Sequence, residues 1–388
     1  MPPALARMQR ALASALRSAG PQTGAEVFDL TAGKALLSVR GAIKRPPASV
    51  EKLYTTVAVL RRLGAETRLQ TTVLGTGRLM ADGAWAGDLY LRGGGDPTFG
   101  DSAFNLIWEL GYGSTASDLA VQLIARGIRR VSGSIIGDAS LFDSRRGGPA
   151  TGYGPDVPDF GGQLGALTYD HGSTTRRLSP GAFAAHELML ILRADHVRGR
   201  ASRRTGVTPR SARVLATVDS PPMSVLLRLT DVPSDDLFAE LLTKQLGSRF
   251  GAGGSISAGA RVITDVVHAY DLHPRILDGS GLSRQDRSSP LEVVDLLRYI
   301  WRTPVGAQLS ESLPVVGVNG TVRTLATRTP ARGRCIAKTG TLDGVTNLAG
   351  YCHSRGRHLL AFALFLDGPS NERALALIGR MVGALARY

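Results

Sequence analysis

The chain has 388 residues, of which 43% are apolar, and this composition predicts a folded globular protein of two or more domains. A formal charge of +14 favours anionic surroundings, but the densest basic cluster, residues 198–213, lacks interleaved aromatic side chains, which argues against a dedicated nucleic-acid surface. Only two cysteines occur, which excludes a disulfide-dense scaffold and a zinc site built on several thiolates.

The first part of the chain is expected to form a helix, two strands and a second helix. Apolar side chains at helical spacing predict a helix over residues 3–18. Residues 25–29 and 35–39 predict strands joined by a turn. The next helix begins at Ser49, so Ser49 is expected at or near a helix N-terminus.

The middle of the chain differs from its two ends in residue composition and hydrophobic pattern. Between Leu74 and about Asp219, short β-like runs alternate with frequent glycines and turn pairs. This predicts one or more inserted, β-rich domains over residues 74–219. Residues 1–73 and 220–388 are then the two parts of one domain that the insertion divides.

The last part of the chain returns to long helical and strand patterns. The expected helices and strands, in chain order, are helices from 233 to 246, 259–270 and 291–301, strands 335–341, 345–352 and 358–366, and a helix over 371–387. Strands bracketed by helices at both ends of the sequence predict an α+β fold, with one antiparallel sheet and helices packed on it.

The two cysteines fall on the expected hairpin near the C-terminus. A turn at Asp343-Gly344 would place Cys335 opposite Cys352 on the paired strands. A cross-strand disulfide in an oxidising compartment and two small, reduced core residues are both compatible with this placement.

Three short polar motifs lie in widely separated segments. They are Ser49-x-x-Lys52, Ser234-x-Asp236 and the run from Lys338 through Thr339 and Gly340 to Thr341. Lysine is scarce in this arginine-rich chain, and two of the five lysines lie in these motifs. A lysine can supply a free amine as a base, whereas an arginine cannot.

The motifs suit acyl transfer to a serine. Ser49 and Lys52 are three residues apart on a helix, so they share a face, and Lys52 could remove the proton of the attacking hydroxyl. Burial and a second cation, Lys338, would both favour a neutral lysine. Backbone amides of Ser49 and Thr341 could stabilise a tetrahedral oxyanion, and Gly340 would let a ligand approach the backbone.

The motif set and its context resemble a known family. The order of motifs is that of penicillin-binding proteins and class A β-lactamases. Residues 48–56, 88–98, 278–284 and 337–341 resemble the D-alanyl-D-alanine carboxypeptidases and endopeptidases of the class C, penicillin-binding protein 4 type, peptidase family S13. The resemblance implies a penicillin-binding/β-lactamase-like transpeptidase domain, an antiparallel sheet with helices on both faces, with an inserted β-rich domain. The inserted stretch departs from the family in length, because it is short, and this indicates that the usual third subdomain is trimmed to about residues 172–215.

The resemblance further implies a role for each motif residue. Ser49 would be the acylated nucleophile, Lys52 the general base and Ser234 a proton relay. Lys338, Thr339 and Thr341 would bind the terminal carboxylate of the substrate, with Gly340 and Asp236 beside them. The implied substrate is the D-Ala-D-Ala end of a peptidoglycan stem peptide or a D-amino-acid cross-link, and penicillins would acylate the same serine.

The implied location is the cell envelope, periplasmic or extracellular. The first twenty residues nevertheless lack the central apolar block of a signal peptide. The sequence contains no run of about 18 apolar residues, so no integral membrane segment is expected. Neither a cofactor nor a metal is expected, and the oligomeric state stays open.

One residue departs from the family pattern. The second motif normally ends in asparagine, whereas this chain has Asp236, which can only accept hydrogen bonds when it is ionised. A carboxylate beside Lys52 would favour the protonated lysine and weaken the base. The alternatives to a working DD-peptidase are therefore a wall-binding pseudoenzyme and a serine β-lactamase or esterase on the same fold. His171, a lone histidine in an expected loop, is interpreted as structural.

Overall fold

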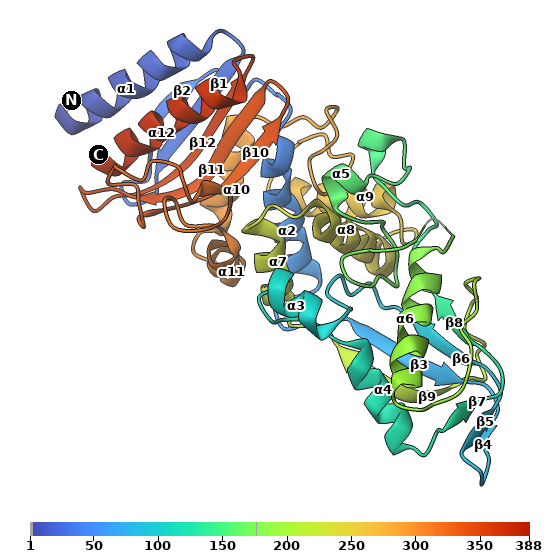
Figure 1. Ribbon diagram of the computed structural model, residues 1–388. Coiled ribbons are helices and arrows are strands. Elements are labelled where there is room, and N and C mark those ends of the chain that lie inside the picture. The colour runs from blue at the N-terminus through green and yellow to red at the C-terminus, as the bar shows by residue number, and fades with distance from the viewer. Residues whose placement is uncertain (1–2, 176) are drawn as a thin grey trace. The chain divides into compact units, whose positions relative to one another are not determined.

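A computed structural model describes residues 3–175 and 177–388 (Figure 1). The chain forms two compact units, each built from separate stretches of sequence. The first unit comprises Met1–Ala65, Ser224–Ala239 and Ala260–Tyr388, and the second comprises Glu66–Met223 and Glu240–Gly259. The stretch expected as an insertion, 74–219, lies within the second unit, which also takes in residues 66–73, 220–223 and 240–259.

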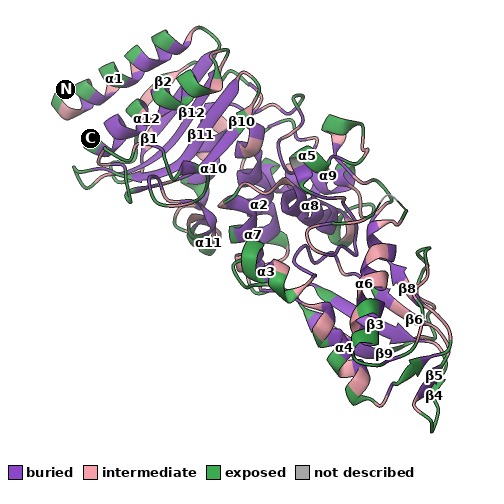
Figure 2. Cartoon of the chain, viewed as in Figure 1, coloured by how far each residue is buried: buried purple, intermediate pink, exposed green. Residues whose placement is uncertain are grey.

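A five-stranded sheet forms the centre of the first unit, in the order β10-β11-β12-β1-β2 with antiparallel pairing throughout. The strands are β1 (Thr23–Asp29), β2 (Lys34–Val39), β10 (Cys335–Leu342), β11 (Val345–His353) and β12 (Leu359–Asp367). β12 lies in the middle of the sheet, and Figure 2 shows it buried along its length.

Helices cover both faces of this sheet. On one face α1 (Pro3–Ala19) and α12 (Asn371–Arg387) pack beside each other, as Figure 1 shows. Each presents one apolar stripe, because its buried residues recur every three or four positions. On the other face lies α10 (Pro290–Ile300), where the Tyr351 hydroxyl donates to the Leu297 carbonyl at 2.7 Å. The expected α+β architecture is confirmed.

The remaining helices of the first unit carry or support the polar motifs. They are η1 (Ala48–Glu51), α2 (Lys52–Arg62), α7 (Met223–Asp231), the start of α8 (Asp236–Phe250), most of α9 (Ile256–His268), α11 (Pro304–Ser312) and the 3-10 turn η3 (Gly320–Val322). The sequence patterns did not predict α7 or α11. Both are short, and α11 begins at a proline that the sequence pattern alone does not distinguish from a loop proline.

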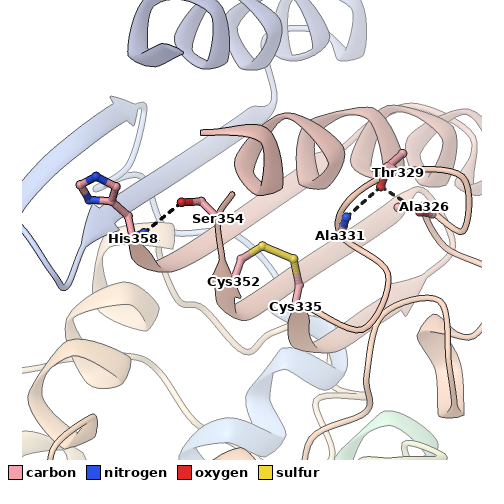
Figure 3. The surroundings of a disulfide bond; sticks show 7 residues. All are labelled: Ala326, Thr329, Ala331, Cys335, Cys352, Ser354 and His358. Atoms are coloured by element: carbon pink, nitrogen blue, oxygen red, sulfur yellow. Dashed lines mark hydrogen bonds between the residues drawn. A yellow bond between two sulfur atoms is a disulfide. The ribbon is translucent and has the colours of Figure 1, made fainter. Parts of the chain in front are cut away.

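A disulfide joins β10 to β11. The strand register places Cys335 directly opposite Cys352, and the two sulfurs are bonded (Figure 3). Both cysteines are fully buried. The cross-strand disulfide is therefore confirmed, and the alternative of two reduced core residues is wrong.

The second unit contains more helix than its sequence suggested. It has a four-stranded sheet in the order β8-β6-β3-β9 and a three-stranded sheet in the order β4-β5-β7. Its strands are β3 (Gln70–Gly75), β4 (Arg78–Leu79), β5 (Ala84–Ala86), β6 (Leu89–Arg92), β7 (Arg130–Val131), β8 (Ile135–Asp138) and β9 (Arg213–Asp219). Its helices are α3 (Ser102–Trp108), α4 (Ala116–Ala125), α5 (Val157–Phe160), α6 (Pro180–Ala194) and the 3-10 turn η2 (Pro149–Thr151). α4 and α6 supply Leu119, Leu123 and Leu188 to the core of this unit.

Candidate active site

Ser49 lies in η1, immediately before α2, as the sequence predicted. The turn that presents it is tight, because Ala48 has a left-handed backbone with φ +48°. Gly281 lies against this turn, and a Cβ atom at Gly281 would come within 2.0 Å of the Ala48 carbonyl oxygen. Ser49 itself is half-buried.

Lys52 is completely buried, and its Nζ atom has three acceptors. They are Ser49 Oγ at 3.1 Å, Asp236 Oδ1 at 2.5 Å and the Ser280 carbonyl at 2.8 Å. An ammonium group has three hydrogens, so this arrangement uses all of its donor capacity. The Ser280 carbonyl was not predicted as part of the site, because a backbone oxygen has no sequence signature.

Asp236 is the first residue of α8, and its carboxylate faces Lys52. Burial raises the pKa of Asp236, and the adjacent Lys52 opposes the rise. The expected juxtaposition of this carboxylate with the base is therefore present. The raised pKa makes Asp236 a better proton acceptor than an ordinary carboxylate, so one proton can be shared between Asp236 and Lys52.

Ser234 and Lys338 form a second hydrogen-bonded pair. Ser234 adopts a left-handed backbone with φ +68°, and Lys338 Nζ donates to its Oγ at 2.7 Å. Lys338 is fully buried and also donates to the Thr339 carbonyl at 3.1 Å. Burial and the charge of Lys52 lower the pKa of Lys338 to about 7, although Asp231 and Asp236 oppose the change.

Asp231 is a buried carboxylate near this pair that the motifs did not predict. Its Oδ2 accepts from Thr56 Oγ1 at 2.9 Å and from Ser312 Oγ at 2.7 Å. Burial raises the pKa of Asp231 to about 6, against the attraction of Lys338. In the sequence, Asp231 is an acidic residue at the end of an apolar helical run. Such a residue is ordinarily exposed, so the pattern gave no reason to place it in the site.

Two further buried carboxylates shape the loop that contacts Lys52. Asp278 accepts from the backbone N–H of Gly281 at 2.7 Å and of Ser283 at 2.8 Å, and Asp286 accepts from that of Leu277 at 2.7 Å. Burial and the charge of Asp278 raise the pKa of Asp286 to about 11, so Asp286 is protonated at neutral pH. These bonds fix the loop, and with it the Ser280 carbonyl.

β10 is the edge strand beside the nucleophile. The Ala337 N–H points to the outer edge, away from β11, and donates to the Pro314 carbonyl at 3.0 Å. Because alternate residues of a strand point their backbone groups the same way, the N–H groups of Thr339 and Thr341 face this edge too. A Cβ atom at Gly340 would lie 2.5 Å from the Pro47 carbonyl oxygen, so glycine permits β10 to pack directly against η1.

Thr339 has its side chain on the α12 face of the sheet. Its register partner Leu348 belongs to the core on that face, and its Oγ1 donates to Thr321 Oγ1 at 2.7 Å. Thr341 is exposed. The predicted site residues of the three motifs therefore lie in one unit, while His171 lies in the second unit, on a turn with φ +57°.

The described residues contain no cluster of three or more His, Cys, Asp or Glu side chains arranged to hold a metal ion. The chemical capacity of the site comes from serine hydroxyls, two buried lysines and buried carboxylates. Such a set can transfer an acyl group to Ser49 and move protons along the pairs that contact it.

A comparison with protein families identifies the family to which the chain belongs. The sequence model of the D-Ala-D-Ala carboxypeptidase 3 (S13) family matches residues 8–188 and 160–388. The chain belongs to the S13 family. This confirms the predicted family and the expectation of a serine-type hydrolase of the D-Ala-D-Ala carboxypeptidase class.

Relatives of this S13 chain cover most of its length. A D-alanyl-D-alanine carboxypeptidase of Actinomadura sp. is 28% identical over 456 residues, covering 95% of this chain and 82% of the relative. The carboxypeptidase DacB of Mycolicibacterium smegmatis is 28% identical over 394 residues, with the same coverage of 95% and 82%.

Solved structures share the fold of this S13 chain. Penicillin-binding protein 4 of Haemophilus influenzae has a TM-score of 0.81 at 20% identity, covering 97% of this chain and 99% of that one. A predatory endopeptidase of Bdellovibrio bacteriovorus, acylated by penicillin G, has a TM-score of 0.58 at 15% identity, covering 94% and 91%. The predicted penicillin-binding-type fold is thus confirmed.

Proposed function

We propose that this protein is a serine DD-peptidase that hydrolyses D-Ala-D-Ala ends or D-amino-acid cross-links of peptidoglycan through an acyl-enzyme on Ser49. The observation that carries the proposal is the contact of 3.1 Å between Ser49 Oγ and the buried Nζ of Lys52. A buried lysine three residues after a half-buried serine, on the same helical turn, is the geometry of an activated nucleophile.

In the acylation step Ser49 Oγ attacks the carbonyl carbon of the penultimate D-Ala, and its proton passes to Lys52. Lys52 can accept that proton only in its neutral form, and an ionised Asp236 carboxylate at 2.5 Å works against that form. The C–N bond then breaks. Ser234 donates a proton to the leaving amine and recovers one from Lys338, 2.7 Å away.

The edge of β10 would bind the substrate during this step. The N–H groups of Ser49 and Thr341 would donate to the oxyanion, because Gly340 brings the two backbones together. The substrate carboxylate would interact with the positive charge of Lys338 and the hydroxyls of Thr339 and Thr341. Water then hydrolyses the ester on Ser49. The water oxygen bonds to the acyl carbon while a water proton passes through Ser234 to Lys338, and Lys52 returns a proton to Ser49 Oγ as the C–O bond breaks and the shortened peptide leaves.

The cellular setting of the proposal is the envelope, where peptidoglycan stem peptides are found. The carboxypeptidase names of the relatives support this setting. Within the described residues, no helix combines the length and apolar character needed to cross a bilayer. β-Lactams are the proposed covalent inhibitors, in line with the penicillin-acylated endopeptidase of the same fold.

The first experiment is the intact mass of the protein after incubation with benzylpenicillin, beside a Ser49→Ala variant. A penicilloyl adduct on the unmodified chain alone is expected, together with D-Ala release from a pentapeptide ending in D-Ala-D-Ala. Absence of both adduct and D-Ala release would overturn the proposal.

A second candidate function rests on one observation, the contact of 2.5 Å between Lys52 and Asp236. If the shared proton stays on Lys52, the protein would bind wall peptides and turn over little, as a peptidoglycan-binding pseudoenzyme. Binding of a D-Ala-D-Ala pentapeptide with neither D-Ala release nor cleavage of a cross-linked peptide dimer would favour this candidate. A third possibility, a β-lactamase or esterase, would release the penicilloyl group rapidly in the same mass measurement.

A further inference from the structure

The second unit has a polar pocket on one face of its four-stranded sheet. The pocket has a volume of about 560 Å³. Its wall comes from β3 and β6, from the loop after β8 and from the second half of α8, and all of these residues belong to the second unit. Among the described residues that line it, none belongs to the three motifs. The pocket is therefore distinct from the proposed acylation site.

The strand register places polar side chains of the wall on one face of the sheet. Thr72 of β3 lies directly opposite Arg92 of β6, so their side chains share a face, and Gln70 joins them two residues earlier on β3. The neighbouring pair Val73 and Leu91 points to the opposite face and belongs to the apolar core there. The pocket therefore lies on the face that points away from this core.

Two glycines make the floor of the pocket from bare backbone. A Cβ atom at Gly94 would lie 2.3 Å from the Gln70 carbonyl oxygen, and one at Gly93 would lie 2.1 Å from the Ala166 carbonyl oxygen. Both oxygens are backbone atoms, which cannot rotate aside, so only glycine permits this close approach. The space beside the strand ends consequently contains no side chain from these two positions.

Three arginines give the pocket a positive charge. They are Arg68, Arg92 and Arg249, and all three are exposed. None of them belongs to an ion pair within the described part of the chain. The described lining also includes no carboxylate. Three guanidinium groups thus border one pocket without an acidic residue in its wall.

Two acidic residues stand on the strands beside the pocket, and both already accept hydrogen bonds. Asp219 of β9 accepts from Gln70 Nε2 at 2.9 Å. Asp138 of β8 accepts from the backbone N–H of Ser140 at 2.9 Å and from that of Thr208 at 2.8 Å. The three arginines exceed these two carboxylates by one charge, so the surroundings of the pocket stay positive.

A buried glutamine holds one of the three arginines. Gln245 and Arg249 are four residues apart on α8, so they share a side of the helix. Gln245 is 1% exposed, and with its amide oriented by the hydrogen-bond network its oxygen accepts from Arg249 Nε at 2.8 Å and Nη2 at 3.1 Å. These bonds use two of the five guanidinium donors and fix the group in place. A side chain that is already fixed loses less entropy when a ligand binds.

We propose that this pocket binds a phosphate ester. A phosphoryl group carries up to two negative charges and three acceptor oxygens, which suits several guanidinium groups together with the lining hydroxyls of Thr72 and Ser140. A single carboxylate has two acceptor oxygens, which one arginine can satisfy, so it would leave most of these donors unused. The inference goes beyond the proposed function and does not depend on it, because no motif residue takes part.

The test is calorimetric titration of the 388-residue chain at pH 8 with two phosphate esters. Glycerol phosphate represents a phosphomonoester, and an oligomer of glycerol phosphate represents a phosphodiester chain. Succinate, which carries the same double charge on carboxylates, is the control ligand. The pocket variant is Arg92→Gln with Arg249→Gln. The control variant, Arg203→Gln with Arg210→Gln, removes the same charge from exposed positions of the second unit outside the lining.

We expect one-to-one binding of at least one ester, weakened about tenfold or more in the pocket variant because two charged donors are lost. The control variant should bind almost as tightly as the unmodified chain. Tighter binding of glycerol phosphate would identify a phosphomonoester as the ligand, and tighter binding of the oligomer would identify a phosphodiester chain. Either result supports the inference.

Three outcomes would overturn the inference. They are equal weakening in the pocket and control variants, succinate binding as tight as that of the esters, and no binding of either ester with a Kd below about 1 mM. Arg92 and Arg249 are exposed, so their substitution should leave the thermal unfolding midpoint unchanged. Measurement of that midpoint separates a lost binding site from a lost fold.

Discussion

At the scale of single residues, the site is a small cluster of buried charges in which lysines and carboxylates alternate. Asp236 contacts Lys52 directly, while Asp231 interacts electrostatically with Lys338. Each lysine thus has a carboxylate near it, which offsets part of the desolvation of its charged form. Reactivity then depends on where a few shared protons reside.

We expect the substitution Asp236→Asn to increase the rate of acylation by benzylpenicillin about tenfold. An amide does not favour the charged form of Lys52 as a carboxylate does, so more of the lysine is available as a base. The rate is measured by intact mass over time. Asp235→Asn removes the same charge one residue away and should leave the rate near that of the unmodified chain. A rate for Asp236→Asn at or below the unmodified value would show that Asp236 does not limit acylation.

The charge of Lys338 should make substrate binding depend on pH. The pKa of Lys338 is lowered to about 7, so its positive charge is present below pH 7 and is lost as the pH rises through that value. This charge is proposed to hold the substrate carboxylate. KM for a D-Ala-D-Ala pentapeptide should therefore rise severalfold between pH 6 and pH 9. The upper limit is about a tenfold rise in KM for each pH unit above the pKa, because the charged fraction of Lys338 falls by that factor. A Lys338→Arg variant keeps its charge, so its KM should stay flat with pH, although its activity is lower. A flat KM in the unmodified chain would count against the role of Lys338.

The sequence predicted the reactive side chains of the site better than the backbone groups and loops that hold them in place. Ser49, Lys52, Ser234 and Lys338 occur in short motifs with fixed spacing, and the structure brings them together. The supports, such as the Ser280 carbonyl, come from loops whose shape depends on distant contacts. Lysine scarcity was an ambiguous signal, because Lys244 is also buried, in an ion pair with Asp143 of the second unit.

At the scale of elements, the site depends on how closely η1 packs on β10. A Cβ atom at Gly340 would lie 2.5 Å from the Pro47 carbonyl oxygen and 2.9 Å from the Val50 nitrogen, and both are backbone atoms. Backbone atoms cannot rotate away as a side chain does. The short distance between η1, which carries Ser49, and the backbone N–H of Thr341 therefore depends on the absence of a side chain at residue 340.

Gly340→Ala should accordingly reduce acylation about a hundredfold, the effect expected when a nucleophile is displaced by about 1 Å. The rate with benzylpenicillin is measured beside the thermal unfolding midpoint, which separates displacement from unfolding. Gly154→Ala is the matched control, since the nearest atom to its Cβ would be the Thr151 carbonyl oxygen at 3.5 Å. A near-normal rate in Gly340→Ala would mean that η1 can move without loss of function.

Long elements with a strong pattern were predicted well, and short ones were not. The helix predicted over residues 371–387 is α12 as observed, since its apolar stripe is continuous and Pro369-Ser370 precedes it. α4 and α6 of the second unit were missed, because the surrounding glycines and turns dominated the pattern. Helices of that length draw much of their stability from packing, which sequence patterns do not report.

At the scale of the whole molecule, the first unit is closed by strands from opposite ends of the chain. β1 pairs with β12 over the register from Thr23–Leu366 to Asp29–Leu360. β12 also pairs with β11, so it connects the motif strand and its neighbour to the N-terminal strands. Without β12, the sheet would divide into two parts.

A chain that ends at residue 357 should therefore fail to react with penicillin, although it contains Ser49, Lys52, Ser234 and Lys338. Removal of β12 and α12 exposes the core face shared by α1 and β11, and the edge strand loses its support. Labelling with a fluorescent penicillin measures this, with the unshortened 388-residue chain as the control. Labelling of the shortened chain at the normal rate would show that the motifs assemble without the central strand.

The pairing of β1 with β12 also sets the order of events during synthesis. The ribosome makes Ser49 before it makes Leu359–Asp367, the strand that completes the surroundings of the serine. A nascent chain consequently carries its serine without a formed acylation centre until that strand has been made, and the hydroxyl stays chemically inert during that time. Reactivity toward penicillin would then mark the moment at which a newly made molecule has finished folding.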